Sequence, residues 1–335
     1  HMGIRAQAEA MPLSQSIGRL GVDLERVERG YRITGIIEDS PAVETEMPLE
    51  VGDVITAIDL VPFDLGSTPP DTVGGRLRGK SGSEVIVTVL RAVPAAEDGV
   101  AEEPVELDLL LTPISNSAVR GLVYRATQRR RSALVDEWSG GRLGYTHIRG
   151  MNQPSLDEFE RDIFAAAEGR DGLVVDGRDN GGGWTTDRLL ASIMARPHAY
   201  TIPRGADQSS TGNYPQDRLY IQRYMLPMNM LCNEKSYSNA EIISHAFKTL
   251  GRGTLVGQRT HGSVISTGGT SLIDGTSVRL PFRGWYLQSG EDMENNGAVP
   301  DLIVVQTPED EVAGIDAQLK AAVDDLLTRL DEPLP

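Results

Sequence analysis

Short apolar runs that alternate with helical segments after residue 142 constrain the fold of this chain more than any other feature. Strands are predicted over residues 143–148, 172–176, 226–232 and 254–257, and helices over 155–167, 186–196 and 239–250. Ser155 is the expected N-cap of the first of these helices, because Glu158 follows it at the capping-box spacing. Strands that alternate with helices form a parallel sheet that the helices cover. The sequence therefore predicts an α/β layer over residues 142–335.

The region before this layer has a different pattern, rich in β-branched residues. Strands are predicted over 33–37, 85–90 and 105–111, and the Pro- and acid-rich segment 94–104 is predicted to be a surface loop. A long helix is predicted over 115–138. We therefore expect four parts, which are a tag remnant with the tail of an upstream region, a mostly β domain, a linker helix and an α/β core (residues 1–13, 14–112, 113–141 and 142–335).

Net charge excludes one class of partner. The chain carries 48 acidic and 32 basic side chains, a formal charge of −16. Because so negative a surface repels phosphate backbones, we expect no nucleic-acid partner. The one basic cluster, Arg129 to Arg131, is predicted to be a solvated helix face.

The sequence predicts no membrane span, because no segment approaches the ~18 uninterrupted apolar residues that a span requires.

Cysteine and histidine usage restricts the chemistry further. Cys232 is the single cysteine, which excludes an internal disulfide and a multi-cysteine metal site. None of the five histidines lies in a metal-spaced pair. We expect no metal and no cofactor, and a reducing, cytoplasmic compartment.

A glycine-rich turn follows the predicted strand 172–176 and precedes a helix, as Asp179-Asn180-Gly181-Gly182-Gly183-Trp184. Consecutive glycines allow positive φ and leave backbone N–H groups unobstructed beside a helix N-terminus, where negative charge is favoured. The turn lacks the spacing of a P-loop or a dinucleotide fold. A tight structural turn and a site for a developing oxyanion both fit it.

Ser238 stands at a second junction between a strand and a helix. A serine there is commonly an N-cap, but it can also be a nucleophile whose oxyanion the amide of Asn239 would stabilise. Glu294 lies in a Gly/Asn/Pro loop, where a carboxylate is usually solvated, and His261 is the only histidine in a loop that could belong to a site. The residues alone leave these alternatives open.

Residues 14–112 resemble a PDZ domain. The resemblance rests on three segments: Ile36-Ile37-Glu38-Asp39-Ser40-Pro41-Ala42, Leu49-Glu50-Val51-Gly52-Asp53-Val54-Ile55 and Leu77-Arg78-Gly79-Lys80-Ser81-Gly82-Ser83. It implies that Arg19, Leu20, Gly21 and Val22 form a carboxylate-binding loop for peptide C-termini.

Residues 142–335 resemble the catalytic core of tricorn-type and C-terminal-processing serine peptidases. The strongest matches are Gly144 to Ile148, Leu173 to Gly183 and Leu255 to Thr260, and the Asp-x-Arg-x-Asn-Gly-Gly-Gly string is the most specific of them. The resemblance implies an α/β fold with a crotonase/Clp-protease-like core after a mostly β PDZ domain, and an assembly into homo-oligomers.

The site residues implied by the resemblance distinguish the two branches. Ser238 matches the nucleophile, and Gly183 and Asn239 match the oxyanion amides. The processing branch has a lysine base where this chain has Ser263. The tricorn-type string Glu-Asn-x-Gly-x-x-Pro-Asp is matched from Glu294 onward, which makes Glu294 an expected site residue.

This chain departs from the tricorn-type pattern at two points. The base histidine of that branch precedes the PDZ domain, whereas residues 2–13 here contain none, so either His261 replaces it or the chain is a fragment without its base. Tyr200 is followed by Thr201 rather than an acid, so a preference for Lys or Arg before the cleaved bond is not implied.

The sequence therefore predicts a serine peptidase, of endopeptidase or carboxypeptidase-type processing activity, whose PDZ domain binds substrate C-termini. The alternative is an incomplete fragment or pseudo-peptidase that acts as a peptide-binding module. An acyl-CoA enzyme of the crotonase type is a third possibility, since that fold shares backbone oxyanion holes.

Overall fold

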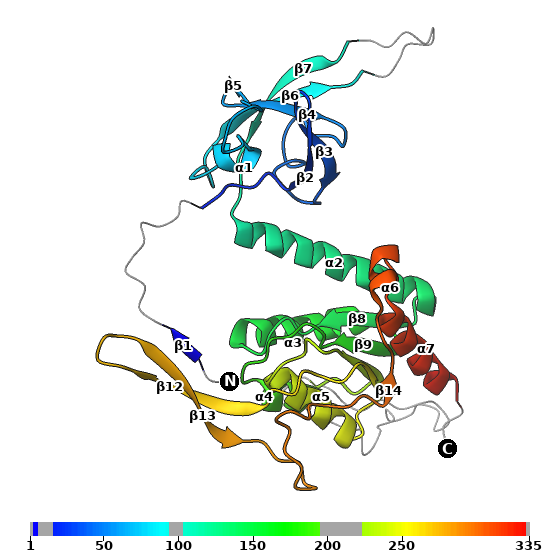
Figure 1. Cartoon of the computed structure of the whole chain (residues 1–335). Coiled ribbons are helices and arrows are strands. Elements are labelled where there is room, and N and C mark those ends of the chain that lie inside the picture. The colour runs from blue at the N-terminus through cyan, green and yellow to red at the C-terminus, as the bar shows by residue number, and fades with distance from the viewer. Residues whose placement is uncertain (1–2, 6–15, 94–102, 195–222, 333–335) are drawn as a thin grey trace, which may run out of the picture. The chain divides into compact units, whose positions relative to one another are not determined.

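The chain divides into two units in the computed structural model, which describes residues 3–5, 16–93, 103–194 and 223–332. One unit spans residues 8–129, and the other combines residues 1–7 with residues 130–335. The boundary falls inside helix α2 (Asn116–Ser139), which is continuous (Figure 1). The loop predicted over 94–104 lies almost wholly outside the described residues.

An antiparallel sheet with strand order β2-β3-β4-β6-β7 forms the unit of residues 8–129, and β5 pairs with β4. A single turn of helix, α1, and the first half of α2 complete the unit. Its elements are β2 (Val22–Val27), β3 (Gly30–Ile36), β4 (Val54–Ile58), β5 (Val61–Pro62), α1 (Val73–Arg76), β6 (Val85–Arg91) and β7 (Val105–Leu111).

The core of this unit follows from the period of two along its strands. Val85 and Val87 of β6 face Leu111 and Leu109 of β7 across the ladder, and all four side chains are buried. Apolar residues at alternate positions bury one face of a strand, so these pairs hold the sheet to its core.

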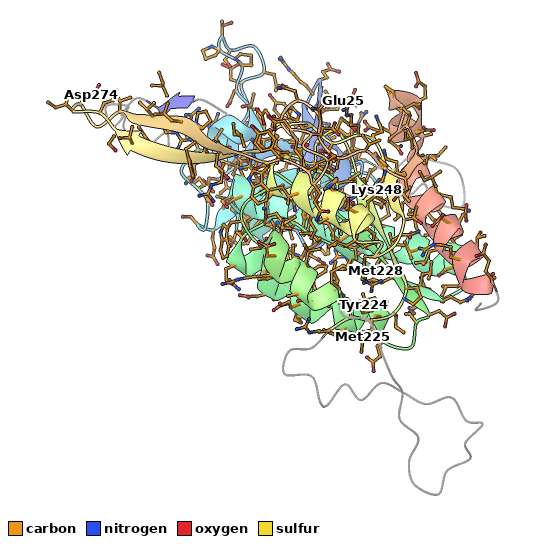
Figure 2. The ribbon with its side chains drawn as sticks, turned by 90° about the horizontal axis from the view of Figure 1, so that it is seen from below. Glu25, Tyr224, Met225, Met228, Lys248 and Asp274 are labelled. Atoms are coloured by element: carbon orange, nitrogen blue, oxygen red, sulfur yellow. The ribbon has the colours of Figure 1, made fainter. Side chains whose placement is uncertain are left out.

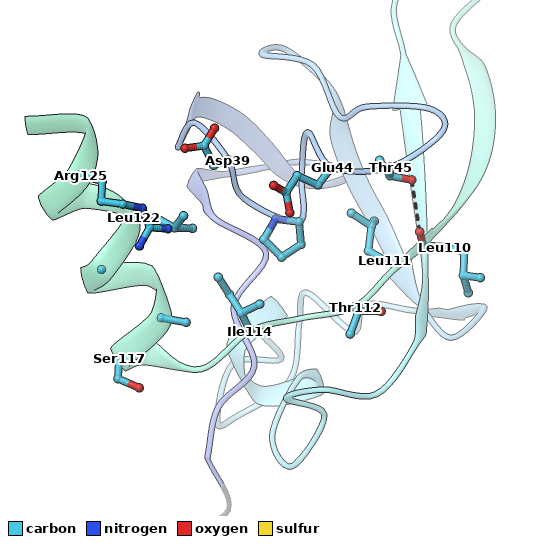
Figure 3. A pocket seen from close by; sticks show the side chains of 13 residues that line it. Asp39, Glu44, Thr45, Leu110, Leu111, Thr112, Ile114, Ser117, Leu122 and Arg125 are labelled. Carbon is cyan, nitrogen blue, oxygen red and sulfur yellow. Dashed lines mark hydrogen bonds between the residues drawn. The ribbon is translucent and has the colours of Figure 1, made fainter. Parts of the chain in front are cut away.

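The first half of α2 packs on this unit beside the loop that follows β3 (Figure 3). Leu122 is buried there, and Arg129 forms ion pairs of 2.9 Å with both Glu38 and Asp39. Between the helix, this loop and the end of β7 lies a cavity of about 750 Å³. Figure 3 shows Arg125 of α2 extending toward Asp39 across it. The helix predicted as a linker is therefore partly a wall of the β unit.

A parallel sheet with strand order β14-β11-β10-β9-β8 forms the centre of the other unit. The predicted alternation is observed from β8 to β11, with a helix between each strand and the next. The elements are β8 (Leu143–His147), α3 (Gln153–Ala167), β9 (Gly172–Asp176), α4 (Thr186–Ile193), β10 (Met228–Cys232), α5 (Asn239–Thr249), β11 (Leu255–Gly257), β14 (Leu302–Ile303), α6 (Pro308–Ala313) and α7 (Ala317–Asp331).

Helices cover both faces of this sheet, because its strands are apolar on both sides. Leu173 and Val175 pack in the cluster formed with α3, α4 and α5, whereas Val174 between them packs in the cluster formed with α7. Strands buried on both faces are typical of parallel sheets. The carboxyl ends of β9, β10 and β11 thus lie side by side at one edge (Figure 1).

A second, antiparallel sheet in this unit was not predicted. It contains β1 (Gly3–Arg5), β12 (Ile265–Ser271) and β13 (Ser277–Gly284), in the order β1-β13-β12. Asp274 lies at the tip of the β12–β13 hairpin (Figure 2), where its carboxylate accepts hydrogen bonds from Thr276.

Two predicted helix limits are wrong by two residues or more. Helix α3 begins at Gln153, and the side chain of Asn152 accepts the capping hydrogen bond from the amide of Ser155. Ser155 is therefore inside the first turn and is not the cap. Helix α4 ends at Ile193 rather than at residue 196. In the described residues, no helix has the length and apolarity that a membrane crossing requires.

Candidate active site

The glycine-rich turn after β9 packs directly on the turn after β10. At Gly182, where φ is +81°, an added Cβ would lie 2.5 Å from the carbonyl oxygen of Tyr237 and 2.7 Å from Cβ of Ser238. Only glycine permits this approach, because any side chain would collide with the serine turn. The structure thus brings two predicted site segments into contact.

Ser238 has a backbone conformation that a non-glycine residue rarely adopts, with φ 56° and ψ −115°. Such a conformation costs on the order of 1–3 kcal/mol and persists only when its surroundings impose it. Ser238 precedes α5 directly, so it occupies a sharp strand-to-helix turn of the kind that exposes a nucleophilic serine.

Two backbone amides at this junction are available to an incoming oxyanion. Among the described residues, the N–H groups of Gly183 and Asn239 have no hydrogen-bond acceptor. Asn239 is fixed by Thr186 at the start of α4, whose amide donates to Oδ1 of Asn239 at 3.0 Å and whose hydroxyl donates to its carbonyl oxygen at 2.9 Å. The N-termini of α4 and α5 therefore meet at the two amides, where their dipoles favour negative charge.

Glu241 holds the serine turn in place, a role that sequence reasoning missed. Its side chain is fully buried and accepts a hydrogen bond of 2.9 Å from the amide of Ser238. It also accepts hydrogen bonds from the hydroxyl of Thr260 at 2.7 Å and from the amides of Gly262 and Ser263 at 2.5 and 2.9 Å. One carboxylate thus joins the turn after β10 to the loop after β11. Glu241 follows Ser238 by three residues, which is the spacing of a capping box, and this spacing could have indicated its role from the sequence.

His261 lies on the same loop, beside the serine turn. Its amide donates to the carbonyl oxygen of Ser236, and its ring lies 5.0 Å from the ring of Tyr237, centroid to centroid. Within the described parts of the chain, no hydrogen bond joins the His261 ring to Ser238.

The loop that carries Glu294 packs against this arrangement. The amide of Asn295 donates to the carbonyl oxygen of Gly262 at 2.7 Å, and an added Cβ at Gly297 would lie 3.0 Å from Oε2 of Glu241. Glu294 itself is half-buried, and its amide donates to the carboxylate of Asp292. The structure therefore places the Glu294 loop next to the loop of His261.

A buried ionic cluster anchors the base of the glycine-rich turn. Asp176 at the end of β9 is completely buried and accepts hydrogen bonds from Nε and Nη2 of Arg178 and from the hydroxyl of Tyr145. Burial alone would raise the pKa of Asp176, but the charge and hydrogen bonds of Arg178 and the further positive charge of Arg131 together outweigh it and hold the pKa well below its usual range. Burial lowers the pKa of His147, whose ring Nε2 lies 3.1 Å from the carbonyl oxygen of Arg178.

Two further groups of residues were predicted from the sequence. Tyr200 and Thr201 lie outside the described residues. Arg19, Leu20, Gly21 and Val22 belong to the other unit, where they line a groove of about 360 Å³ together with α1 and the first turns of α2.

The comparison with protein families identifies the segment that carries the junction. Residues 142–304 match the model described as peptidase family S41. This segment belongs to peptidase family S41. Residues 142–304 form the S41 segment. This segment contains the site residues from Asp176 to the Glu294 loop.

Sequence relatives extend the similarity beyond the S41 segment. Tricorn protease homolog 1 of Streptomyces coelicolor is 34% identical over 326 residues, which cover 94% of this chain and 28% of the relative. The tricorn protease of Thermoplasma volcanium is 30% identical over 94% of this chain and 29% of the relative. The resemblance to tricorn-type serine peptidases is confirmed.

A solved structure agrees with these relatives. The crystal structure of the tricorn protease matches with a TM-score of 0.74 and 27% identity, over 95% of this chain and 29% of that chain. The mixed α/β fold around the S41 segment is therefore shared with that protein. The chain spans less than a third of the length of these relatives.

Proposed function

We propose that this chain is a serine peptidase that cleaves peptides with Ser238 as its nucleophile. The observation that supports the proposal most is the strained Ser238 turn packed against Gly182. Beside it lie the amides of Gly183 and Asn239, which have no acceptor among the residues that the structure describes. We further propose that the S41 segment has a crotonase/Clp-protease-like core and that residues 14–112 are a PDZ domain.

In the proposed mechanism, Oγ of Ser238 attacks the carbonyl carbon of the scissile bond and its proton passes to an imidazole. The amides of Gly183 and Asn239 bind the resulting oxyanion, and one such donor stabilises the transition state by about 3 kcal/mol. Collapse breaks the C–N bond, and the imidazolium gives its proton to the leaving amine. Water then cleaves the acyl-enzyme by the same steps, and Glu294 supports the site electrostatically.

The source of the imidazole distinguishes two forms of the proposal. His261 would serve within this chain, because its loop is already held beside the serine turn by Ser236 and Glu241. A histidine supplied by an upstream region is the second form. Both leave the roles of Ser238, Gly183 and Asn239 unchanged.

A fluorophosphonate probe read by intact mass tests the nucleophile. We expect one adduct on the chain and none on the Ser238→Ala variant, because the probe reacts with an activated serine hydroxyl. Ser236→Ala is the matched control, since Ser236 is two residues away but donates its hydroxyl to the carbonyl of Gly177. An adduct that survives in Ser238→Ala would contradict the proposal.

Loss of the adduct in His261→Gln would assign the base to His261. If the intact chain forms no adduct, the same probe is applied after the upstream region is restored. Failure in that form as well would refute the peptidase and leave the peptide-binding module as the function.

The groove in the unit of residues 8–129 supports a peptide-binding role. In the part of that unit that the structure describes, the amides of Leu20 and Gly21 have no hydrogen-bond acceptor, and Gly21 has φ +83°. Apolar side chains of Val22, Val73 and Leu77 line the groove beside them. We propose that a peptide C-terminus binds here, with its carboxylate on the two amides.

A peptide that ends in a free valine carboxylate tests this groove against its C-terminal amide. We expect the free carboxylate to bind at least about tenfold more tightly by fluorescence anisotropy, because the amide cannot form charge-assisted hydrogen bonds with the loop. Equal affinities would contradict the assignment. Binding without an adduct at Ser238 would favour the binding module over the peptidase.

We also propose that the chain assembles into homo-oligomers and works in the cytoplasm.

A further inference from the structure

An exposed tryptophan follows the proposed oxyanion turn directly. Trp184 is 57% exposed, although large aromatic side chains are usually buried on folding. Its Cα lies about 3.8 Å from that of Gly183, the distance across one trans peptide bond. The indole therefore stands within one residue of an amide that would bind the scissile carbonyl.

The backbone beneath this tryptophan is fixed. The amide of Trp184 donates to the carbonyl oxygen of Met151 at 2.8 Å, and Gly183 forms a parallel bridge with Met151. An added Cβ at Gly183 would lie 1.9 Å from the same carbonyl oxygen. The position of Trp184 relative to the oxyanion turn is therefore set by backbone contacts on both sides of Gly183.

The ring of Trp184 is also held by its neighbours. The guanidinium of Arg188, in the first turn of α4, stacks over the indole at 5.1 Å from the ring centroid. Arg188 in turn donates a hydrogen bond to the side-chain carbonyl of Gln153 at the start of α3. One face of the ring thus packs against a cation, while more than half of the residue remains exposed to solvent.

We propose that Trp184 is a substrate-binding residue that receives an aromatic or large apolar side chain of the peptide next to the scissile bond. A fixed, exposed indole loses little conformational freedom on binding and offers a large apolar surface. The inference rests on the proposed peptidase function. It adds a substrate class, namely extended peptides with such a side chain flanking the cleavage point.

Calorimetry on the full chain with Ser238→Ala tests the inference without turnover. The probes are N-acetylated, C-amidated penta-alanine and the same peptide with phenylalanine at its centre. Amidation keeps both peptides from the carboxylate-binding groove of the other unit. We expect the phenylalanine peptide to bind about tenfold more tightly than penta-alanine.

Three further substitutions in the same background assign that preference to the indole. Trp184→Ala should abolish it, whereas Trp184→Phe should retain most of it because an aromatic ring remains. Phe282→Ala is the matched control, since Phe282 is a 66% exposed aromatic side chain with a stacked arginine, Arg283, on the β12–β13 hairpin. That variant should keep the full preference.

Equal affinity for the two peptides, or a preference that persists in Trp184→Ala, would overturn the inference. Failure of the peptidase proposal is recognised separately, by the absence of a fluorophosphonate adduct at Ser238 both in this chain and after the upstream region is restored. An adduct at Ser238 together with equal peptide affinities would therefore refute the role of Trp184 alone.

Discussion

Replacing Glu241 by alanine is expected to lower the free energy of unfolding by about 4 kcal/mol. The substitution removes a buried carboxylate and leaves its donors from Ser238, Thr260, Gly262 and Ser263 without their acceptor. Each buried donor left without a partner costs about 1–3 kcal/mol, and water entering the space would offset part of the sum. Urea unfolding of the full chain, followed by circular dichroism, measures the loss.

Glu234→Ala is the control for this experiment, because Glu234 is an exposed glutamate seven residues earlier. Its substitution should change the unfolding free energy by less than about 0.5 kcal/mol. A loss in Glu241→Ala as small as in this control would show that the two loops do not depend on the buried carboxylate. Glu241→Gln should lie between them, since its amide group retains one acceptor oxygen but turns a donor toward the other N–H groups.

Replacing Gly182 by alanine is expected to slow the reaction of Ser238 with the fluorophosphonate probe by about 100-fold or more. The new methyl group would lie 2.5 Å from the carbonyl oxygen of Tyr237 and 2.9 Å from the amide nitrogen of Asn239, so the two turns must separate. Separation displaces the amide of Gly183 from that of Asn239, and the proposed oxyanion site loses one of its donors. The rate of adduct formation by intact mass measures the effect.

Gly181→Ala provides a control one residue away. Gly181 does not have a positive φ, and nothing lies within 4 Å of an added Cβ there. This variant should therefore react at the rate of the parent chain. Similar slowing in both variants would mean that general loosening of the turn, and not its contact with the serine turn, controls reactivity.

The parallel sheet could be predicted because its strands are short, apolar and separated by helices. Gly172–Asp176 was predicted with its correct limits, since a run of apolar residues ends there at a charged residue and the glycine-rich turn. The first residue of α3 was predicted wrongly, whereas its end at Ala167 was correct. Asn152 caps the helix as well as Ser155 would, and the sequence does not say which of these two polar side chains forms the cap.

The β12–β13 hairpin could not be recognised from apolar periodicity. Gly268 and Gly269 lie in the middle of β12, where glycine normally weakens a strand, and β13 contains Pro281. The ring of Phe282 lies over Gly268 and takes the place of its missing side chain. Pairing across the hairpin thus overrides local preference, and that pairing is visible only in three dimensions.

The residues of the candidate site could likewise be predicted only in part. Ser238, Gly183 and Glu294 were chosen from motifs, whose residues are close in sequence. Glu241 and the Asp176–Arg178 pair were given no role, because their partners lie on other segments. Their function as supports depends on contacts between segments that the sequence separates.

The central place of β10 in the parallel sheet ties its opening to the cooperative unfolding of the whole unit. β10 is the middle strand, every one of its five residues is buried, and the serine turn begins directly after it. Strands in such positions exchange their amide hydrogens only when a whole cooperative unit opens. The proposed nucleophile is therefore attached to a strand that is expected to open only with the whole unit, so local fraying elsewhere in this unit should leave the geometry around Ser238 intact.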